Sequence, residues 1–342
     1  MTAVATPYIL MIFTAAALVI AAAGVVITKD ADRLADKTRL GEAMVGAIFL
    51  GMATSLSGSV VSVTAALDGR VSLAFANGVG GIAAQTAFLS LADIMFRRAN
   101  LEHASAELAN VLQAAMLAFL LSLTVVAATG PNITILGIHP VSFVLPVFYV
   151  LGLRAGAQLR KEPMWHPART AETREDAPSD NPADDVPAAI LVARFSALAL
   201  VLAVAGWVIA KAAGVIADRS GLSETIVGTL LTAVATSLPE LVTTLAAVRR
   251  GALQLAVGGI IGGNAFDVLF LSAGDMAYRE GSLYHAVGNA DLLWVGVGLA
   301  MTSVLLLGLI IRQRHGPAGI GFESALILVL YLGAVALQFT YN

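Results

Sequence analysis

Residues 235–275 read ATSLPELVTTLAAVRRGALQLAVGGIIGGNAFDVLFLSAGD, and a second version of this stretch lies 182 residues earlier in the chain. Residues 53–93 read ATSLSGSVVSVTAALDGRVSLAFANGVGGIAAQTAFLSLAD, so that sixteen of 41 aligned positions are identical without a gap. Both copies begin with Ala-Thr-Ser-Leu and end with Phe-Leu-Ser-x-x-Asp. Scattered matches are common between alanine-rich helices, whereas a gapless match with identical ends indicates an internal repeat.

The composition of the chain excludes a soluble enzyme. Only 13% of the 342 residues are charged and 58% are hydrophobic, whereas soluble globular proteins contain about 25% and 45–50%, respectively. Apolar runs of more than about 18 residues recur, which is typical of membrane-spanning helices. The net charge of −3 argues against a nucleic-acid partner, and the absence of cysteine excludes disulfides and thiol chemistry.

The apolar runs predict an all-α integral membrane protein with ten transmembrane helices. They cover residues 7–28, 43–67, 71–96, 104–128, 132–153, 187–217, 224–248, 252–277, 287–311 and 319–340.

A polar stretch divides these helices five to five. Residues 154–186 are rich in Pro, Ala and mixed charge, which is typical of a flexible linker. We therefore expect a first five-helix repeat at 1–153, a cytoplasmic linker at 154–186 and a second five-helix repeat at 187–342. Because five is an odd number, the two repeats cross the membrane in opposite directions. Inverted-topology repeats of this kind build the midplane site of many secondary transporters.

The basic residues predict the orientation of the chain. The loops on the side of the linker, together with Arg194 at its edge, hold sixteen of the 20 Lys and Arg residues. The opposite side holds Arg70, Lys211, Arg219 and Arg279. Since positive loops favour the cytoplasm, both termini are expected outside it, in a multi-pass protein of a prokaryotic plasma membrane.

The second copy of the repeat carries a recognisable motif. Thr236-Ser-Leu-Pro-Glu240-Leu-Val, followed by Gly258-Gly-Ile-Ile-Gly-Gly-Asn-Ala-Phe-Asp267, resembles the α-repeat of the cation/calcium exchanger superfamily, the sodium/calcium exchanger membrane region. The pattern of that family is roughly (G/A)TSLPEL followed by GN(V/I)IGSN-x-x-(D/N). The first copy, Thr54-Ser-Leu-Ser-Gly58 and Gly80-Gly-Ile-Ala-Ala-Gln85, is degenerate.

Glu240 and Asp267 lie near the middle of their predicted helices. A carboxylate at the centre of a bilayer costs on the order of 2.5–3.5 kcal/mol, so a cation, a proton or water must compensate it. The resemblance implies that both acids are metal ligands of a transported cation, Ca²⁺ or Na⁺. The alternative is a protonated acid that is hydrogen-bonded within the bundle.

The resemblance also implies roles for neutral residues. Thr236 and Ser237, with Thr54 and Ser55 from the first copy, would supply oxygen ligands; the alternative is that these small polar residues only help helices to pack. Gln85 can offer one carbonyl oxygen. Structural or gating roles are expected for Pro239, which should kink its helix, and for Gly58, Gly81 and Gly263, which permit close approach.

The number of acids limits the substrate. Gly58 occupies the position where the family has a second glutamate, and Gln85 the position where it has Asn or Asp. The predicted site therefore contains two carboxylates, which can neutralise one Ca²⁺ or two protons. A full set of separate Na⁺ and Ca²⁺ sites is harder to build from them.

We expect a secondary antiporter that exports Ca²⁺ in exchange for Na⁺ or H⁺ by alternating access, and not an enzyme. The alternatives are a monovalent cation (Na⁺ or K⁺)/H⁺ antiporter and a transport-inactive relative that acts as a sensor or assembly partner. No phosphate-binding loop is present, so ATP and other cofactors are not expected. Membrane lipids and the transported cations are the expected partners, and the oligomeric state stays open.

Four further acids lie near the ends of predicted helices. Asp93 and Asp275 are expected to cap helices, with attraction of cations as the alternative. Glu107 and Glu323 are expected to be solvated. His139-Pro140 is expected to kink the fifth helix, with the imidazole satisfied within the bundle; the alternative is a proton relay.

Overall fold

The computed structural model describes residues 5–38, 54–96, 98–164, 166–173, 186–316 and 319–341. The start of the predicted second helix lies outside these residues, as do positions 165 and 174–185 of the predicted linker. The helices of the described residues are α1 (Thr6–Thr38), α4 (Leu56–Leu67), α5 (Val71–Met95), α6 (Leu101–Ala104), α7 (Leu108–Thr129), α8 (Val141–Lys161), α9 (Ala188–Ser220), α10 (Glu224–Ile226), the π-helical segment Val227–Thr232, α11 (Ala233–Thr236), α12 (Leu238–Arg250), α13 (Leu253–Ala277), α14 (Leu283–Ala286), α15 (Asn289–Ile311) and α16 (Phe322–Gln338).

The helices identify a multi-pass membrane protein. Among the described residues, seven helices are long and apolar enough to cross a membrane, and the bent run Glu224–Arg250 makes an eighth. The helices α4 and α16 are apolar but shorter. The predicted all-α membrane class is confirmed, and the number of ten spans stays a prediction.

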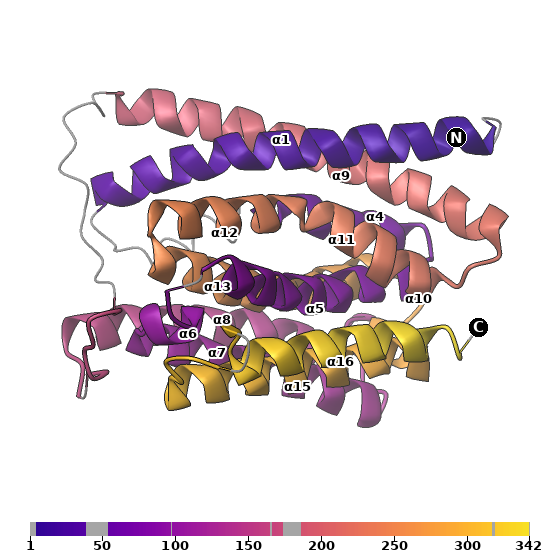
Figure 1. The fold of residues 1–342 in the computed structure, drawn as a ribbon. Helices are drawn as coiled ribbons and strands as arrows, with labels where there is room; N and C mark the ends of the chain where they lie inside the picture. Colours follow the sequence, from indigo (N-terminus) through magenta and orange to yellow (C-terminus); the bar gives the residue numbers. More distant parts are fainter. Residues whose placement is uncertain are drawn as a thin grey trace.

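The helices form three layers (Figure 1). The long helices α1 and α9 lie side by side in an outer layer. The middle layer contains α4, α5 and α10 to α13, and the other outer layer contains α7, α8, α15 and α16. Neighbouring helices cover the middle helices α5 and α13, so that 78% and 89% of their apolar windows are buried. Both ends of the chain lie at the same end of the bundle.

Glycines let the outer helices approach the middle layer. In α1, a Cβ on Gly24 would overlap Pro239 of α12. In α9, a Cβ on Gly206 would overlap the backbone of Ser57 in α4. The two contacts are related by the offset of the sequence repeat, because each pair of equivalent residues is 182 positions apart. We call two residues that are 182 positions apart an offset pair.

Two aspartates connect separate segments of the chain in the same way. Asp93 of α5 accepts the backbone N–H of Leu101, at 2.7 Å, and that of Gly321, at 3.0 Å. Asp275 of α13 accepts the backbone N–H of Leu283, at 2.7 Å, and that of His139, at 2.8 Å. Asp93, Leu101 and Gly321 are the offset partners of Asp275, Leu283 and His139, respectively. As the capping interpretation requires, each carboxylate binds the first residue of a short helix, α6 or α14.

The fifth predicted helix begins later than its apolar run suggests. Residues 132–140 precede α8 instead of forming part of it. This segment contains Gly137, which has a φ of 82°, and ends at Pro140, which cannot donate the hydrogen bond of a continuing helix. The expected kink at His139-Pro140 is therefore wrong: the helix starts at this point.

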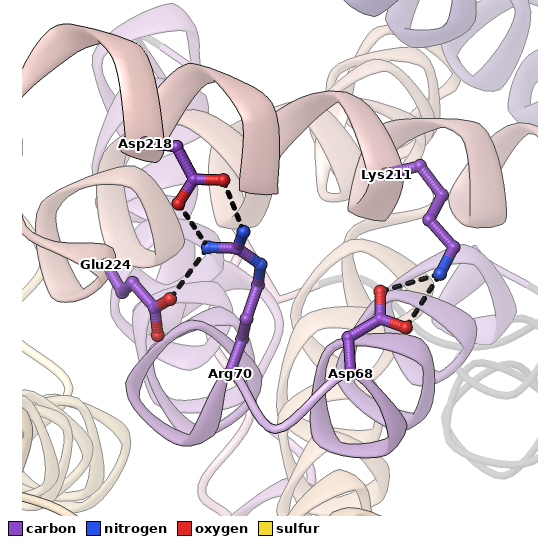
Figure 2. Close-up of polar contacts among 5 residues, drawn as sticks. All are labelled: Asp68, Arg70, Lys211, Asp218 and Glu224. Carbon is purple, nitrogen blue, oxygen red and sulfur yellow. Dashed lines mark hydrogen bonds and ion pairs between the residues drawn. The ribbon is translucent and has the colours of Figure 1, made fainter. Parts of the chain in front are cut away.

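Ion pairs connect α9 to the turn between α4 and α5 (Figure 2). Arg70 binds Asp218 at 2.5 Å and Glu224 at 2.9 Å. Lys211 binds Asp68 at 2.6 Å. The hydrogen bond to Asp218, followed by the charge of the same carboxylate and the contact with Glu224, raises the pKa of Arg70 despite its partial burial. These pairs lie at the same end of the bundle as the chain termini.

Candidate functional site

A small polar pocket lies between the two hairpins of the middle layer. Its lining comes from α4 and α5 on one side and from the α11–α12 junction and α13 on the other. Ten described residues line it, and none of them is basic. They are Ser55, Gly58, Asn77, Gly81, Gln85, Thr236, Ser237, Glu240, Asp267 and Phe270.

Glu240 reaches the pocket because the helix breaks just before it. The chain bends by 44° between Thr236 and Leu238, and Ser237 at the break has a φ of −92° and a ψ of 3°. Pro239 lies in the first turn of α12, where its missing N–H costs no helical hydrogen bond. The bend places Glu240 in the first turn of a new helix, where the helix dipole favours a negative group.

The carboxylate of Glu240 is buried in the pocket. Its side chain is 3% exposed, and neither carboxylate oxygen has a hydrogen-bond partner among the described residues. The hydroxyl groups of Thr54 and Ser55 lie beside this carboxylate without forming a well-aligned hydrogen bond. Carboxylate and hydroxyl oxygens therefore face the same small space.

Asp267 and Gln85 form an offset pair and touch each other directly. Gln85 Nε2 donates to Asp267 Oδ2 at 2.7 Å and lies 3.2 Å from Ser237 Oγ. The other oxygens of both side chains, Asp267 Oδ1 and Gln85 Oε1, have no partner among the described residues. Because equivalent positions meet here, the pocket lies where the two copies of the sequence repeat come together.

Gly58 is covered by an aromatic ring. A Cβ at this position would lie 2.8 Å from Cε2 of Phe270, and only 3.6 Å from the hydroxyl of Thr236. Phe270 therefore occupies the space that a second glutamate would need. Gly81 differs, because a Cβ there would lie 3.4 Å from Asp267 Oδ2, an ordinary contact distance.

Sequence reasoning missed two lining residues. Asn77 donates to the backbone oxygen of Gly58 and to Ser62 Oγ, at 3.0 Å in both cases, while its own Oδ1 has no partner among the described residues. Phe270 belongs to the Phe-Leu-Ser end shared by both copies, which signals packing rather than a site. For Asn77 a signal did exist, because the other copy has glycine at this position.

The structure brings together most of the residues that the sequence singled out. Eight of them line the pocket: Glu240, Asp267, Thr236, Ser237, Ser55, Gln85, Gly58 and Gly81. Thr54 lies beside Glu240, and Pro239 contacts Gly24 of α1. Gly263 is buried within α13 but does not line the pocket.

The donor set determines what the pocket can bind. Carboxylate, hydroxyl and amide oxygens are the hard ligands that Ca²⁺ and similar cations prefer. Thr236 Oγ1 donates its own hydrogen to the carbonyl of Thr232, at 2.9 Å, so its lone pairs remain available. Within the described residues, no cluster of three His, Cys, Asp or Glu side chains is placed to hold a metal. The pocket combines two acids with neutral oxygens instead.

Comparisons with known proteins agree with this picture. Residues 7–153 and 190–340 match the family described as sodium/calcium exchanger protein. The fold is similar to that of the sodium-calcium exchanger NCX_Mj, with a TM-score of 0.64 and 19% identity over 96% of this chain and 98% of that one. It is also similar to the H⁺/Ca²⁺ exchanger CAX, with a TM-score of 0.68 and 13% identity over 97% and 88% of the two chains. A comparison with curated proteins found no match.

Proposed function

This chain belongs to the sodium/calcium exchanger protein family, and from this premise we propose that it is a secondary antiporter that exports Ca²⁺ in exchange for Na⁺ or H⁺. The observation that carries the proposal is the burial of Glu240 and Asp267 in one pocket whose described lining contains no basic residue. Two buried carboxylates without a cationic side chain require a cation or protons to compensate them. Competition between Ca²⁺ and the counter-ion for the same two acids would couple their movements.

Individual residues receive roles from their positions in the pocket. We assign the cation to the carboxylates of Glu240 and Asp267, with the hydroxyl groups of Ser55, Thr236 and Ser237 as neutral ligands. Thr54, beside Glu240, and the carbonyl oxygen of Gln85 complete the proposed set in the same way. Movement of the α11–α12 bend would expose the pocket to alternate sides of the membrane.

The arrangement of the chain in the membrane is part of the proposal. Ten helices would form two inverted five-helix repeats, at 1–153 and 187–342, joined by a cytoplasmic linker at 154–186. Two family matches of similar length support this division, as do the contacts shared by offset pairs. The distribution of the basic residues supports a location of both termini outside the cytoplasm of a prokaryotic cell.

Transport by the full chain in liposomes tests the proposal. Uptake of radioactive calcium should follow an imposed Na⁺ or H⁺ gradient, and Glu240→Gln or Asp267→Asn should remove it. Glu280→Gln, which changes an exposed acid outside the pocket, should leave uptake unchanged. Uptake that survives both pocket substitutions would contradict the assigned site, and no uptake under either gradient would contradict Ca²⁺ as the substrate.

One observation favours a second candidate, a monovalent cation/H⁺ antiporter. Phe270 fills the space beside Gly58, so the pocket contains two acids where a divalent cation and its counter-ions would use more. The same vesicles, loaded with a pH-sensitive dye, would detect Na⁺- or K⁺-driven proton movement. Proton movement without calcium uptake would select this function, and the absence of both would indicate a transport-inactive relative.

A further inference from the structure

Three acidic side chains lie near one another at the end of the bundle that contains α6, and none of them lines the pocket. Asp93 lies near the end of α5, Glu102 on α6 and Glu323 in the first turn of α16. The backbone hydrogen bonds of Asp93 to Leu101 and Gly321 bring α6 and the start of α16 together. Glu102 is 1% exposed and Glu323 is fully buried. The expectation that Glu323 is solvated is therefore wrong.

No well-aligned donor among the described residues compensates the two glutamates. All four of their carboxylate oxygens lack a hydrogen-bond partner among the described residues, and the two carboxyl groups face each other. His103, the next residue on α6, directs its ring nitrogens to the backbone oxygen of Arg312 and to Thr170. The guanidinium of Arg312 binds backbone oxygens and Thr173 instead of either glutamate. Asp93 is a further negative charge that acts on Glu102.

Glycines hold Glu323 in this position. A Cβ on Gly308 of α15 would lie 2.7 Å from Cγ of Glu323, and a Cβ on Gly321 would overlap its Oε1. The side chain is therefore enclosed on two sides. Because it is fully buried, it can reach solvent only if the surrounding segments move apart.

The opposite end of the bundle shows that these carboxyl groups are not needed to build the fold. There, Asp275 makes the equivalent backbone contacts. The offset partners of Glu102 and Glu323 are Tyr284 and Val141, both neutral. Tyr284 contacts Ser142 at 3.2 Å, which satisfies its buried hydroxyl.

Two carboxyl groups in contact, buried and without donors cannot both be ionised, because each charge lacks solvation and repels the other. A metal is disfavoured, because both carboxylate oxygens of Asp93 already accept backbone N–H groups. We propose that Glu102 and Glu323 form a proton-binding site, separate from the pocket at Glu240 and Asp267, in which one shared proton holds α16 against α6.

The direction of the pH response follows from the burial of the pair. Burial, and then the charges of Asp93 and Glu323, raise the pKa of Glu102 well above its ordinary range. The pair therefore keeps its proton to a higher pH than an exposed carboxyl group does. At higher pH, loss of the proton puts two negative charges in contact and separates α16 from α6. In the proposed orientation this end faces the cytoplasm.

A single cysteine tests this site without measuring transport. Because the chain contains no cysteine, Ser324→Cys introduces one thiol beside Glu323, at a fully buried position. Its reaction with a charged maleimide in the full-length purified protein should accelerate with pH more than the same reaction of a free thiol. Release of one proton predicts about a tenfold rise in the exposed fraction for each pH unit below the midpoint. The matched control is Ser142→Cys, the offset partner, whose exposed fraction should not change with pH.

Substitutions of the pair determine the outcome. Glu102→Gln and Glu323→Gln, each in the Ser324→Cys background, should abolish the pH dependence of exposure, whereas Glu280→Gln should retain it. Infrared spectra of the cysteine-free chain should lose a protonated carboxylic acid band at neutral pH in either glutamine variant. Three results would each overturn the proposal. The exposure of the thiol at position 324 could be independent of pH, its pH dependence could survive both glutamine variants, or its exposure could change with Na⁺ or Ca²⁺ at constant pH.

Discussion

Offset pairs fall into two groups in this molecule. At the ends of α5 and α13, Asp93 and Asp275 are identical and bind equivalent backbone groups. In the pocket, the members of the offset pair Gly58 and Glu240 differ. Phe270 covers Gly58, whereas Glu240 contributes a carboxylate. The comparison shows that identical aspartates bind the backbone in both halves of the chain, whereas both acids of the pocket come from the second half.

The largest effect is expected where the halves differ most. Asp267→Asn should lower Ca²⁺ affinity by at least the roughly ten- to hundredfold typical of groups around a metal, because it removes one of two carboxylates. Gln85→Ala, at the offset position, removes a neutral group and should cost less than roughly tenfold. Calorimetric titration of both variants measures the difference. Equal losses would show that both halves contribute equally to binding.

Substitution of either of the identical aspartates, Asp93 or Asp275, should lower the free energy of unfolding by a similar amount. Asp93→Asn and Asp275→Asn each place an amide donor against backbone N–H groups and should lower the free energy of unfolding by about 2–4 kcal/mol. Denaturation in detergent measures both, with Glu280→Gln as the neutral control. A cost confined to one variant would contradict the equivalence of the two aspartates.

The crowding at Gly58 can be tested separately from charge. Gly58→Ala should destabilise the protein by about 1–3 kcal/mol, because its Cβ would press on the ring of Phe270. Gly81→Ala lacks such a contact and should cost less. Adding Phe270→Leu to Gly58→Ala should recover most of the loss in the midpoint of thermal unfolding. Without this recovery, Phe270 would not be what excludes a side chain at position 58.

The carboxyl pair at the α6 end should make stability depend on pH. The pKa of Glu102 is raised in the folded chain, so the unfolded chain releases this proton first as the pH rises. The free energy of unfolding should therefore fall as the pH rises from about 4.5, the ordinary pKa of a glutamate, to the raised pKa of Glu102. Glu102→Gln should remove the pH dependence of the midpoint of thermal unfolding over this range, whereas Tyr284→Phe, at the offset position, should retain it.

The smallest effect is expected from the ion pairs at the end that contains the termini. Arg70 binds two carboxylates, while its offset partner is Ala252. Since Arg70 is partly exposed, Arg70→Gln should cost about 0.2–1 kcal/mol for each pair, and less in high salt. Chemical denaturation at two salt concentrations, with Arg279→Gln as the control, measures it. A loss that is insensitive to salt would point to packing instead.

Much of the fold and of the pocket could be predicted from the sequence. The apolar runs and low charge predicted a helical membrane protein, and the repeated motif predicted which residues gather in one pocket. The contact between the offset pair Gln85 and Asp267 was not predicted, because it depends on how the two copies of the repeat pack together. The roles of these residues as cation ligands stay predictions.

The rest depends on packing between segments far apart in sequence. Glu323 resembles a solvated acid at a helix end until α15 and α6 cover it. Phe270 resembles an ordinary core residue, and only the close passage of α4 brings it over Gly58. The late start of α8 has a local signal in Gly137 and Pro140, which apolarity alone obscured.

The hydrogen bond from Gln85 to Asp267 has a consequence for the proposed transport cycle. The amide presents a partial positive charge to the same oxygen that would bind the cargo. A departing cation would then leave behind a carboxylate that already has a weaker partner, rather than a bare charge in a low-dielectric interior. This hydrogen bond would lower the energy barrier for the empty transporter to change its orientation. The strictness of the coupling between the exchanged ions would then depend on Gln85, a neutral side chain.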